Sequence, residues 1–174
     1  PPVATNDAYT TDEDTVLTVP ALGGVLANVS DPDTDPLTAA LSSGPTNGTL
    51  ALNADGSFSY TPNADFNGTD SFTYAANDGT VSSNTATVSI TVNAANDAPV
   101  ADAQSVTTAE DAPVAVTLTG SDLDGDTLTY SVQTNPANGT LSGTAPNLTY
   151  TPNGNFNGPD SFTLVVNDGT VDST

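Results

Sequence analysis

The feature of this sequence that most restricts its fold is an internal repeat with a period of about 90 residues. Four short motifs of the first half return in the second half. They are Tyr60-Thr61-Pro62 and Tyr150-Thr151-Pro152, Phe66-Asn67-Gly68 and Phe156-Asn157-Gly158, Asp70-Ser71-Phe72 and Asp160-Ser161-Phe162, and Asn77-Asp78-Gly79-Thr80-Val81 and Asn167-Asp168-Gly169-Thr170-Val171. The 174 residues are therefore expected to form two small copies of one module.

The spacing between the copies changes toward the N-terminus. Asn47-Gly48-Thr49-Leu50 matches Asn138-Gly139-Thr140-Leu141, and Glu13-Asp14 matches Glu110-Asp111, at offsets larger than those of the later motifs. The first copy therefore carries about six extra residues around positions 21 to 28.

Apolar residues alternate with polar ones in short segments, which is typical of half-buried strands. The clearest segment runs from Thr85 to Val92, with Ala86, Val88, Ile90 and Val92 on one face. Similar runs lie at Leu17 and Val19, Leu37 to Leu41, Leu50 and Leu52, Phe58 and Tyr60, Phe72 to Ala76, Val114 to Leu118, Leu128 to Val132, Leu148 and Tyr150, and Phe162 to Val166. Helical spacing is absent, so we predict an all-β fold of two tandem Greek-key β-sandwiches with little helix.

The second copy stops before the counterpart of its last strand. The first copy continues through Ser82 to Ala94, whereas the sequence ends at Thr174. We expect domains at 1–94 and 100–174 joined by a linker at 95–99, with the second sandwich lacking one edge strand. An unpaired edge exposes backbone donors and acceptors, so either the chain continues or a neighbouring molecule donates a strand.

The charge of the chain excludes several classes of partner. There are 21 Asp and Glu residues but no Lys, Arg or His, which gives a formal net charge of -21. Phosphate groups of nucleic acids and anionic lipids are attracted by Lys and Arg, so neither nucleic acid nor a membrane surface is an expected partner. Neither a membrane span nor a signal peptide is expected within this segment, and any export signal would lie outside it.

The carboxylates gather in turns, which points to bound cations. Two triplets of the form Asp-x-Asp-x-Asp occur, Asp31/Asp33/Asp35 and Asp122/Asp124/Asp126. Such spacing places alternate carboxylates on one side, as a hard cation with six to eight oxygen ligands requires. Without a cation, two carboxylates about 4 Å apart repel by roughly 4 kcal/mol at an effective dielectric of 20. Because the chain has no Cys, disulfides cannot stabilise the modules, and Ca²⁺ is the stabilising agent we expect.

The triplets have two other possible interpretations. An EF-hand loop needs Gly at its sixth position and Glu at its twelfth, but the triplets offer Pro36 and Ser42, or Thr127 and Gln133. The alternative that stays open is that the Asp residues are solvated turn formers, as Asp commonly is.

Taken together, the motifs resemble the bacterial cadherin-like tandem repeats of large secreted adhesins. The resemblance covers nearly the whole chain and is carried by Glu-Asp-Thr, Val-Leu-Ala-Asn, Asn-Gly-Thr-Leu, Asn-Ala-Asp-Gly-Ser-Phe-Ser-Tyr-Thr-Pro, Phe-Asn-Gly-x-Asp-Ser-Phe and Asn-Asp-Gly-Thr. Two departures concern the first copy: Asn28 is followed by Val29 where the family usually has Asp, and the first triplet contains Pro32.

The resemblance implies a calcium site at the junction between consecutive domains. Its implied ligands in this chain are Glu13, Asp70, Asn96, Asp97, Asp122, Asp124, Asp126 and Asp168. An N-terminal site would use Asp31, Asp33, Asp35 and Asp78, and Glu110 and Asp160 would serve the next junction.

No catalytic residues are predicted. Nucleophilic hydrolysis by Ser or Cys needs a base such as His or Lys, and the chain has neither. Carboxylate pairs could in principle act as in glycosidases, but that chemistry needs a sheltered acid with a raised pKa, whereas these carboxylates lie in polar turns.

The function expected from the sequence is structural. We expect a calcium-stiffened stalk or fibre module of a bacterial adhesin or surface matrix protein, secreted and displayed at the cell surface or in the extracellular matrix. Its main partners would be adjacent copies of the same repeat. Alternatives are a carbohydrate-binding or homophilic adhesion module, which needs an exposed aromatic platform, and a filament subunit that assembles by strand donation.

Overall fold

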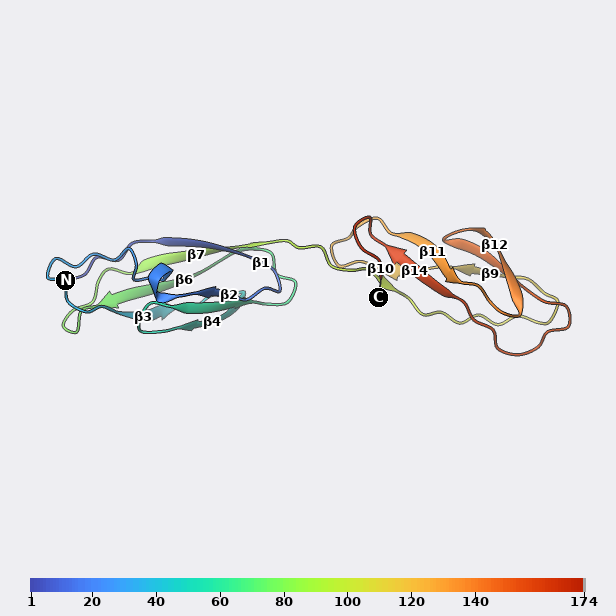
Figure 1. Cartoon of the computed structure of the whole chain (residues 1–174), viewed down its shortest axis with the longest axis horizontal. Helices are drawn as coiled ribbons and strands as arrows, with labels where there is room; N and C mark the ends of the chain where they lie inside the picture. The colour runs from blue at the N-terminus through green and yellow to red at the C-terminus, as the bar shows by residue number, and fades with distance from the viewer. Residues whose placement is uncertain (174) are drawn as a thin grey trace. The chain divides into compact units, whose positions relative to one another are not determined.

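The computed structural model describes residues 1–173 and divides into two compact units, Pro1–Ala95 and a second that begins at Asn96 (Figure 1). All regular elements in these residues are strands, apart from one 3-10 turn, η1 (Ala21–Gly23). That turn falls in the stretch of extra residues that the repeat comparison identifies. None of the described residues form a helix long and apolar enough to cross a membrane.

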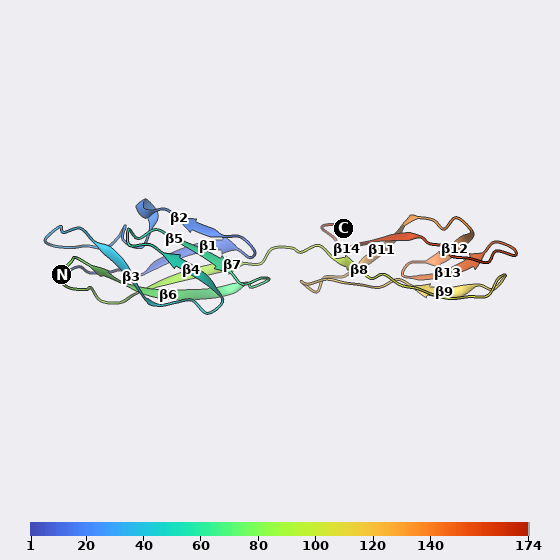
Figure 2. The ribbon, with the colours of Figure 1, turned by 90° about the horizontal axis from the view of Figure 1, so that it is seen from below.

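The first unit is a sandwich of two sheets (Figures 1 and 2). The larger sheet has the order β1-β7-β6-β3 and the smaller sheet the order β2-β5-β4. The strands are β1 (Asp7–Asp12), β2 (Leu17–Val19), β3 (Thr38–Ser43), β4 (Gly48–Leu52), β5 (Phe58–Pro62), β6 (Gly68–Asn77) and β7 (Ala86–Asn93).

The core of the first unit lies between these sheets, because alternate side chains of each strand point inward. In β7 the four predicted inward residues, Ala86, Val88, Ile90 and Val92, are at most 2% exposed. The rings of Phe58 and Phe72 join the two sheets edge to face, with centroids 5.4 Å apart. Each large apolar side chain buried here stabilises the unit by about 1.5–3 kcal/mol.

Strand β1 could not be identified from hydrophobic alternation, because Tyr9 is its one large apolar residue. It pairs in parallel with β7, with Asp7 opposite Val88 and Asp12 opposite Asn93. The pairing continues where the backbone N–H of Glu13 donates to the carbonyl of Asn93 at 2.9 Å. Strand β7 is therefore held on both sides, by β1 and by the antiparallel strand β6.

Within the described residues, the second unit also has seven strands, but they form three sheets where the first unit has two. Its sheets have the orders β12-β13-β9, β11-β14 and β10-β8. The strands are β8 (Val100–Ala101), β9 (Val114–Thr117), β10 (Gly120–Ser121), β11 (Thr129–Thr134), β12 (Gly139–Thr144), β13 (Asn147–Pro152) and β14 (Thr163–Asn167). Within residues 1–173, no strand follows β14 as β7 follows β6 in the first unit.

The buried core of the second unit contains fewer residues than that of the first. Val116, Leu118 and Leu148 form its buried cluster, with partly buried residues packed against them. The alternation predicted a strand from Phe162, but β14 begins at Thr163. The reason is that only β11 pairs with this segment, and that ladder ends at Thr163.

The repeated Asn-Gly motif has a packing explanation. Gly48 lies against the ring of Tyr60, where an added Cβ would come within 2.5 Å of Cε2. Gly139 has the same relationship to the ring of Tyr150. Glycine is needed at both positions because a larger residue would collide with the tyrosine ring and with a backbone carbonyl of the neighbouring strand.

Candidate metal centres

Three carboxylates meet at one end of the first unit, which we call its N-terminal pole. One oxygen from each of Asp31, Asp35 and Asp78 lies within 4.8 Å of the others. Asp31 follows the bridge between Val3 and Ser30, and Asp78 follows the last residue of β6. The sandwich therefore brings together two acidic segments that are far apart in the sequence.

Asp31 has an arrangement that suits a cation ligand. Its side chain is only 3% exposed. One oxygen, Oδ2, accepts the backbone N–H of Asp35 at 3.1 Å, whereas Oδ1 is buried and has no hydrogen-bond partner. The charged N-terminal amino group of Pro1 forms an ion pair with Oδ1 at 3.8 Å, which is too long for a hydrogen bond. A buried carboxylate oxygen without a donor is unfavourable unless a cation approaches it.

The second unit repeats this arrangement at its own N-terminal pole. One oxygen from each of Asp122, Asp124 and Asp126 lies within 4.8 Å of the others. The backbone N–H of Asp126 donates to Oδ1 of Asp122 at 3.0 Å, and Oδ2 of Asp122 is buried without a partner. The first Asp of each triplet thus closes the turn with one oxygen, and its other oxygen is buried without a hydrogen-bond donor.

Asn96 and Asp97 donate hydrogen bonds to acidic residues of the second unit. The side-chain amide of Asn96 donates to Oδ2 of Asp168 at 2.8 Å, and the backbone N–H of Asp97 donates to Oδ2 of Asp124 at 2.8 Å. The residues that open the second unit therefore lie directly against its acidic turns.

Asp78 and Asp168 have a second role in the turns that follow β6 and β14. Oδ1 of Asp168 accepts the backbone N–H groups of Thr170 and Val171, at 2.6 and 2.7 Å. Oδ1 of Asp78 accepts the equivalent pair at 2.7 Å each. The pKa of Asp168 is lowered by the Asn96 amide and these N–H groups, and that of Asp78 by its own two N–H donors. Both side chains are held ionised, with one oxygen engaged by the turn.

Glu13 lies at the opposite end of the first unit, its C-terminal pole. It is 4% exposed, and its oxygens accept the backbone N–H of Ala95 at 2.6 Å and the amide of Asn67 at 3.3 Å. Glu13 thereby attaches the segment after β7 to the sandwich. Its counterpart in the second unit, Glu110, is exposed.

Asp70 and Asp160, two of the predicted ligands, are occupied by protein hydrogen bonds. The oxygens of Asp70 accept the backbone N–H groups of Thr46, Asn47 and Ser71 and the hydroxyl of Tyr60, at 2.8–3.0 Å. Asp160 accepts the equivalent four bonds, from Ala137, Asn138, Ser161 and Tyr150. Burial opposes ionisation of Asp70, but these donors outweigh it and lower its pKa. Both residues therefore anchor the loop before the Gly-Thr-Leu strand, and we leave them out of the metal sites proposed below.

Asp33 is also outside the three-oxygen group of the first unit. Its side chain is 71% exposed, so its position alone gives no reason to count it as a ligand. Conversely, Asp7 is a buried carboxylate that the sequence pattern does not reveal. Its Oδ2 is buried without a hydrogen bond, and Asn28 donates to its Oδ1 at 2.8 Å. Asp7 lies within a strand and has no acidic neighbour in the sequence, so clustering could not reveal it.

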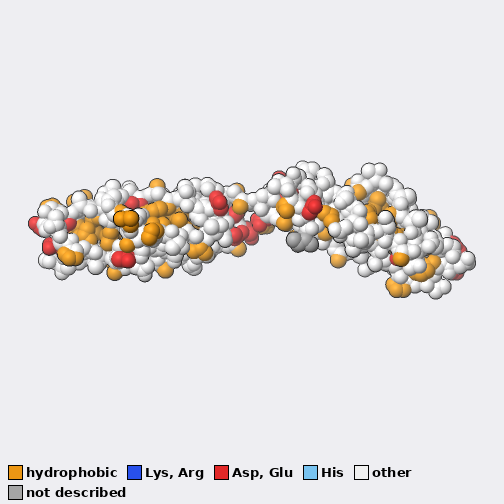
Figure 3. Space-filling model, in the orientation of Figure 1, with side chains coloured by type: hydrophobic (Ala, Val, Ile, Leu, Met, Phe, Trp, Pro, Cys, Tyr) orange, Lys and Arg blue, Asp and Glu red, His pale blue; other side chains and the backbone are white. Residues whose placement is uncertain are grey.

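No basic side chain balances these groups, because the sequence contains none. Figure 3 shows carboxylates as separate red areas with no Lys, Arg or His beside them. Apart from the N-terminal amino group of Pro1 beside Asp31 and Asp33, only protons or cations from solution can neutralise these groups.

Comparison with known families agrees with this architecture. The pattern of the bacterial cadherin-like domain matches residues 1–94. The chain belongs to this family. The rest of the cadherin-like chain, residues 96–174, matches the bacterial Ig domain, which is a closely related sandwich. These matches confirm the all-β, tandem-sandwich prediction and the resemblance on which it was based. Among curated protein sequences, none matches the cadherin-like chain significantly.

Solved structures support the fold. Human CDH23 EC21-23 matches 97% of the chain and 64% of its own length, with 16% identity and a TM-score of 0.53. The protocadherin gamma B2 extracellular cadherin domains 1–5 match 99% of the chain and 37% of their own length, with 18% identity and a TM-score of 0.50. An endo-fucoidan hydrolase, MfFcnA4 from glycoside hydrolase family 107, has 27% identity over 99% of the chain and 27% of its own length, with a TM-score of 0.37. The chain thus spans less than two thirds of each of these proteins.

Proposed function

We propose that this chain is a calcium-binding, non-catalytic segment of an extracellular bacterial surface protein, and that it spaces and stiffens the polypeptide of which it forms part. One observation carries the proposal. In each unit, the first Asp of an Asp-x-Asp-x-Asp triplet has a buried oxygen that lacks any hydrogen-bond donor, and the same residue belongs to a group of three carboxylates.

The donor set favours calcium among common metal ions. The candidate ligands in both groups are carboxylate oxygens, and the chain has no His or Cys to attract zinc. Calcium accepts six to eight oxygens at about 2.3–2.6 Å, so oxygens on opposite sides of one ion are roughly 5 Å apart. Separations up to 4.8 Å are compatible with that geometry. The first site would use Asp31, Asp35 and Asp78, and the second Asp122, Asp124 and Asp126.

Calcium at the second site would also affect the connection between the units. Asn96 and Asp97 are already tied to Asp168 and Asp124 in the second unit. Neutralising the acidic turns would strengthen these attachments and restrain the residues that lead into the unit. The family resemblance also predicts an ion at a domain junction, shared by Glu13, Asn96, Asp97 and Asp168. This stays a prediction.

The stalk function is better supported than carbohydrate binding. A glycan-binding surface commonly presents an exposed aromatic ring, and Tyr9 is the one aromatic residue of β1. Its hydroxyl donates to the carbonyl of Gly23 at 2.8 Å, and its ring packs edge to face on Phe58 with centroids 5.0 Å apart. Because both its hydroxyl and its ring make contacts within the first unit, Tyr9 does not form an open aromatic platform for a glycan.

Calorimetry with calcium and with a chelator tests the proposal. Ions that bind the folded state raise the melting temperature, by an amount that follows their concentration and affinity. We expect at least two calcium ions per chain and higher melting temperatures for both units. A flat titration at millimolar calcium, with unchanged melting temperatures, would refute calcium binding while leaving the fold assignment intact.

A further inference from the structure

The extra residues of the first unit are held by side chains from two of its strands. We call residues 21–29 the inserted segment. Three hydrogen bonds fasten it to side chains on β1 and β6. They join Tyr9 to the carbonyl of Gly23 at 2.8 Å, Tyr74 to the carbonyl of Val25 at 2.6 Å, and Asp7 to the amide of Asn28 at 2.8 Å.

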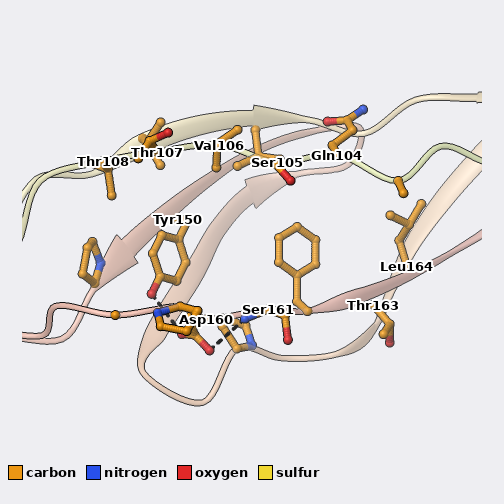
Figure 4. Close-up of a pocket in the computed structure, with 18 of the residues that line it drawn as sticks. Gln104, Ser105, Val106, Thr107, Thr108, Tyr150, Asp160, Ser161, Thr163 and Leu164 are labelled. Carbon is orange, nitrogen blue, oxygen red and sulfur yellow. Dashed lines mark hydrogen bonds between the residues drawn. The ribbon is translucent and has the colours of Figure 1, made fainter.

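The second unit lacks these three side chains together with the inserted segment. By the repeat, the counterparts of Asp7, Tyr9 and Tyr74 are Gln104, Val106 and Leu164. Figure 4 shows the three counterparts on the segments that correspond to β1 and β6. The polar side chains therefore occur in the copy that has a segment for them to hold.

Asp7 is the one member of this set whose charge lacks a partner. Its Oδ2 is buried without a hydrogen bond. The hydroxyl of Tyr74 lies beside the carboxyl, but it has a single hydrogen, and the carbonyls of Thr5 and Val25 already lie 3.2 and 2.6 Å from its oxygen. An ionised Asp7 therefore leaves at least one buried acceptor without a donor, which is unfavourable.

A proton on Oδ2 of Asp7 would satisfy the whole set. The protonated oxygen can donate to the hydroxyl oxygen of Tyr74, which keeps its own hydrogen for Val25, while Oδ1 still accepts the Asn28 amide. Burial raises the pKa of Asp7 above its ordinary value of 3.8 and outweighs the hydrogen bonds of Asn28 and Tyr74, which lower it. The surroundings thus favour the neutral carboxyl.

The titratable groups near Asp7 supply no charge that could replace this proton. Strand β7, which pairs with β1, and the inserted segment contain no titratable residue. Tyr9 and Tyr74 are neutral at physiological pH, because burial raises the pKa of each above 10.0. Asp12 is exposed at the other end of β1, and Asp70 on β6 is engaged by its own donors.

A calcium ion suits this position less well than a proton. Within the part of the chain that the structure describes, Asp7 belongs to none of the groups in which three carboxylates approach one another. An ion here would have a single carboxylate ligand, whereas calcium is usually held by several. Asp7 therefore differs from Asp31, although each has a buried oxygen without a donor.

We propose that Asp7 is a proton-binding site that closes the inserted segment onto the sandwich. With the proton bound, Asp7 connects Asn28 to Tyr74 and so to Val25. When the proton leaves, the buried charge weakens these bonds and the segment opens more often. Because the pKa of Asp7 in the closed state lies above 3.8, closure is strongest below pH 3.8 and weakens as the pH rises through the higher value.

A carbon-13 NMR titration of the intact chain measures the Asp7 carboxyl directly. We expect its midpoint above 3.8, and the same midpoint in the amide signals of Val25 and Ala27, whose N–H groups donate to Gly56 and Gly24. Hydrogen exchange at these two amides reports how often the segment opens. Opening should be about tenfold rarer in acid than at neutral pH for each unit by which the midpoint exceeds 3.8.

Asp7→Asn imitates the neutral carboxyl, since an amide keeps one acceptor and carries N–H donors in place of the proton. At neutral pH this variant should protect Val25 and Ala27 as well as the natural chain does in acid, and its protection should no longer depend on pH. Asp12→Asn is the matched control on the same strand, because Asp12 accepts the amide of Asn93 at 3.0 Å but is exposed. It should keep the pH dependence of the natural chain.

Three outcomes would overturn the proposal. One is a midpoint of the Asp7 carboxyl at or below 3.8. Another is faster exchange of Val25 and Ala27 in Asp7→Asn than in the natural chain at neutral pH. The third is protection that follows added calcium and not pH, which would make the buried oxygen a cation ligand.

Discussion

The hydroxyl of Tyr60 donates a hydrogen bond of 2.9 Å to Oδ2 of Asp70, and Tyr150 makes the same bond, also of 2.9 Å, to Asp160. Each tyrosine is also the residue against which the glycine of the Asn-Gly motif packs. The Tyr–Asp hydrogen bond and the Gly–Tyr packing thus connect three of the repeated motifs, Tyr-Thr-Pro, Asp-Ser-Phe and Asn-Gly-Thr-Leu. The fully buried phenol and the ionised carboxylate hold the loop that precedes β4 in the first unit.

Tyr60→Phe should destabilise the first unit by about 1–3 kcal/mol, because it removes one donor from a buried carboxylate while keeping the ring. Chemical denaturation followed by circular dichroism measures this loss. Tyr9→Phe is a matched control, since the Tyr9 hydroxyl donates to a solvent-exposed carbonyl. Equal losses from the two substitutions would contradict the anchoring role of Asp70.

Gly48→Ala should destabilise the first unit and Gly139→Ala the second, because the added methyl group would collide with the ring of Tyr60 or Tyr150 and with the carbonyl of Thr61 or Thr151. We expect a cost of about 1–3 kcal/mol at Gly48, as for other overpacked sites. Gly44→Ala is the control, since nothing lies within 4 Å of an added Cβ there. Thermal unfolding of the three variants checks the prediction.

The pKa of Asp70 predicts how stability depends on pH. Hydrogen bonds lower it below the ordinary value of 3.8, so ionised Asp70 stabilises the fold above that value. This contribution is lost as the pH falls from 3.8 through the lower folded-state pKa. Asp70→Asn should therefore reduce stability at neutral pH, and its difference from the natural chain should shrink in acid. Denaturant titrations at several pH values would show a constant difference if Asp70 were not responsible.

Asp31→Asn and Asp122→Asn should each abolish one calcium site. The substitution removes the charge of the buried oxygen that we assign to the ion. Each variant should lose about 1 bound ion per chain and most of the calcium-induced rise in melting temperature of its own unit. Asp102→Asn, at an exposed residue outside both acidic groups, should leave stoichiometry and melting unchanged. Isothermal titration calorimetry distinguishes these outcomes.

The two units should unfold separately, the second at the lower temperature, because its buried cluster is smaller. Ile90→Ala should lower only the higher transition, at a cost of about 2–5 kcal/mol, since Ile90 is fully buried in the first unit. Val116→Ala should lower only the other transition. Scanning calorimetry that showed a single transition, shifted alike by both substitutions, would refute this independence.

Much of the fold could be predicted because its signals are local. The alternation in residues 85–92 identified β7 and its buried face, and Pro, Gly, Asn and Asp marked the turns. The Asp-x-Asp-x-Asp spacing predicted acidic groups, and Asp31, Asp35, Asp122, Asp124 and Asp126 do come together within their units. Asp70 and Asp160 also lie in repeated motifs, but a repeat indicates that a residue matters without showing whether it binds metal or backbone.

The sequence by itself determined the two-module organisation, the strand pattern and the excess of carboxylates that only external cations or protons can neutralise. Tertiary structure alone decided that β1 pairs in parallel with β7, and that Asp70 and Asp160 accept hydrogen bonds from the protein itself. The physical reason is the range of the interactions. Side-chain alternation and turn preference act between neighbours, whereas strand pairing and the burial of a single carboxylate oxygen depend on segments brought together from distant parts of the chain.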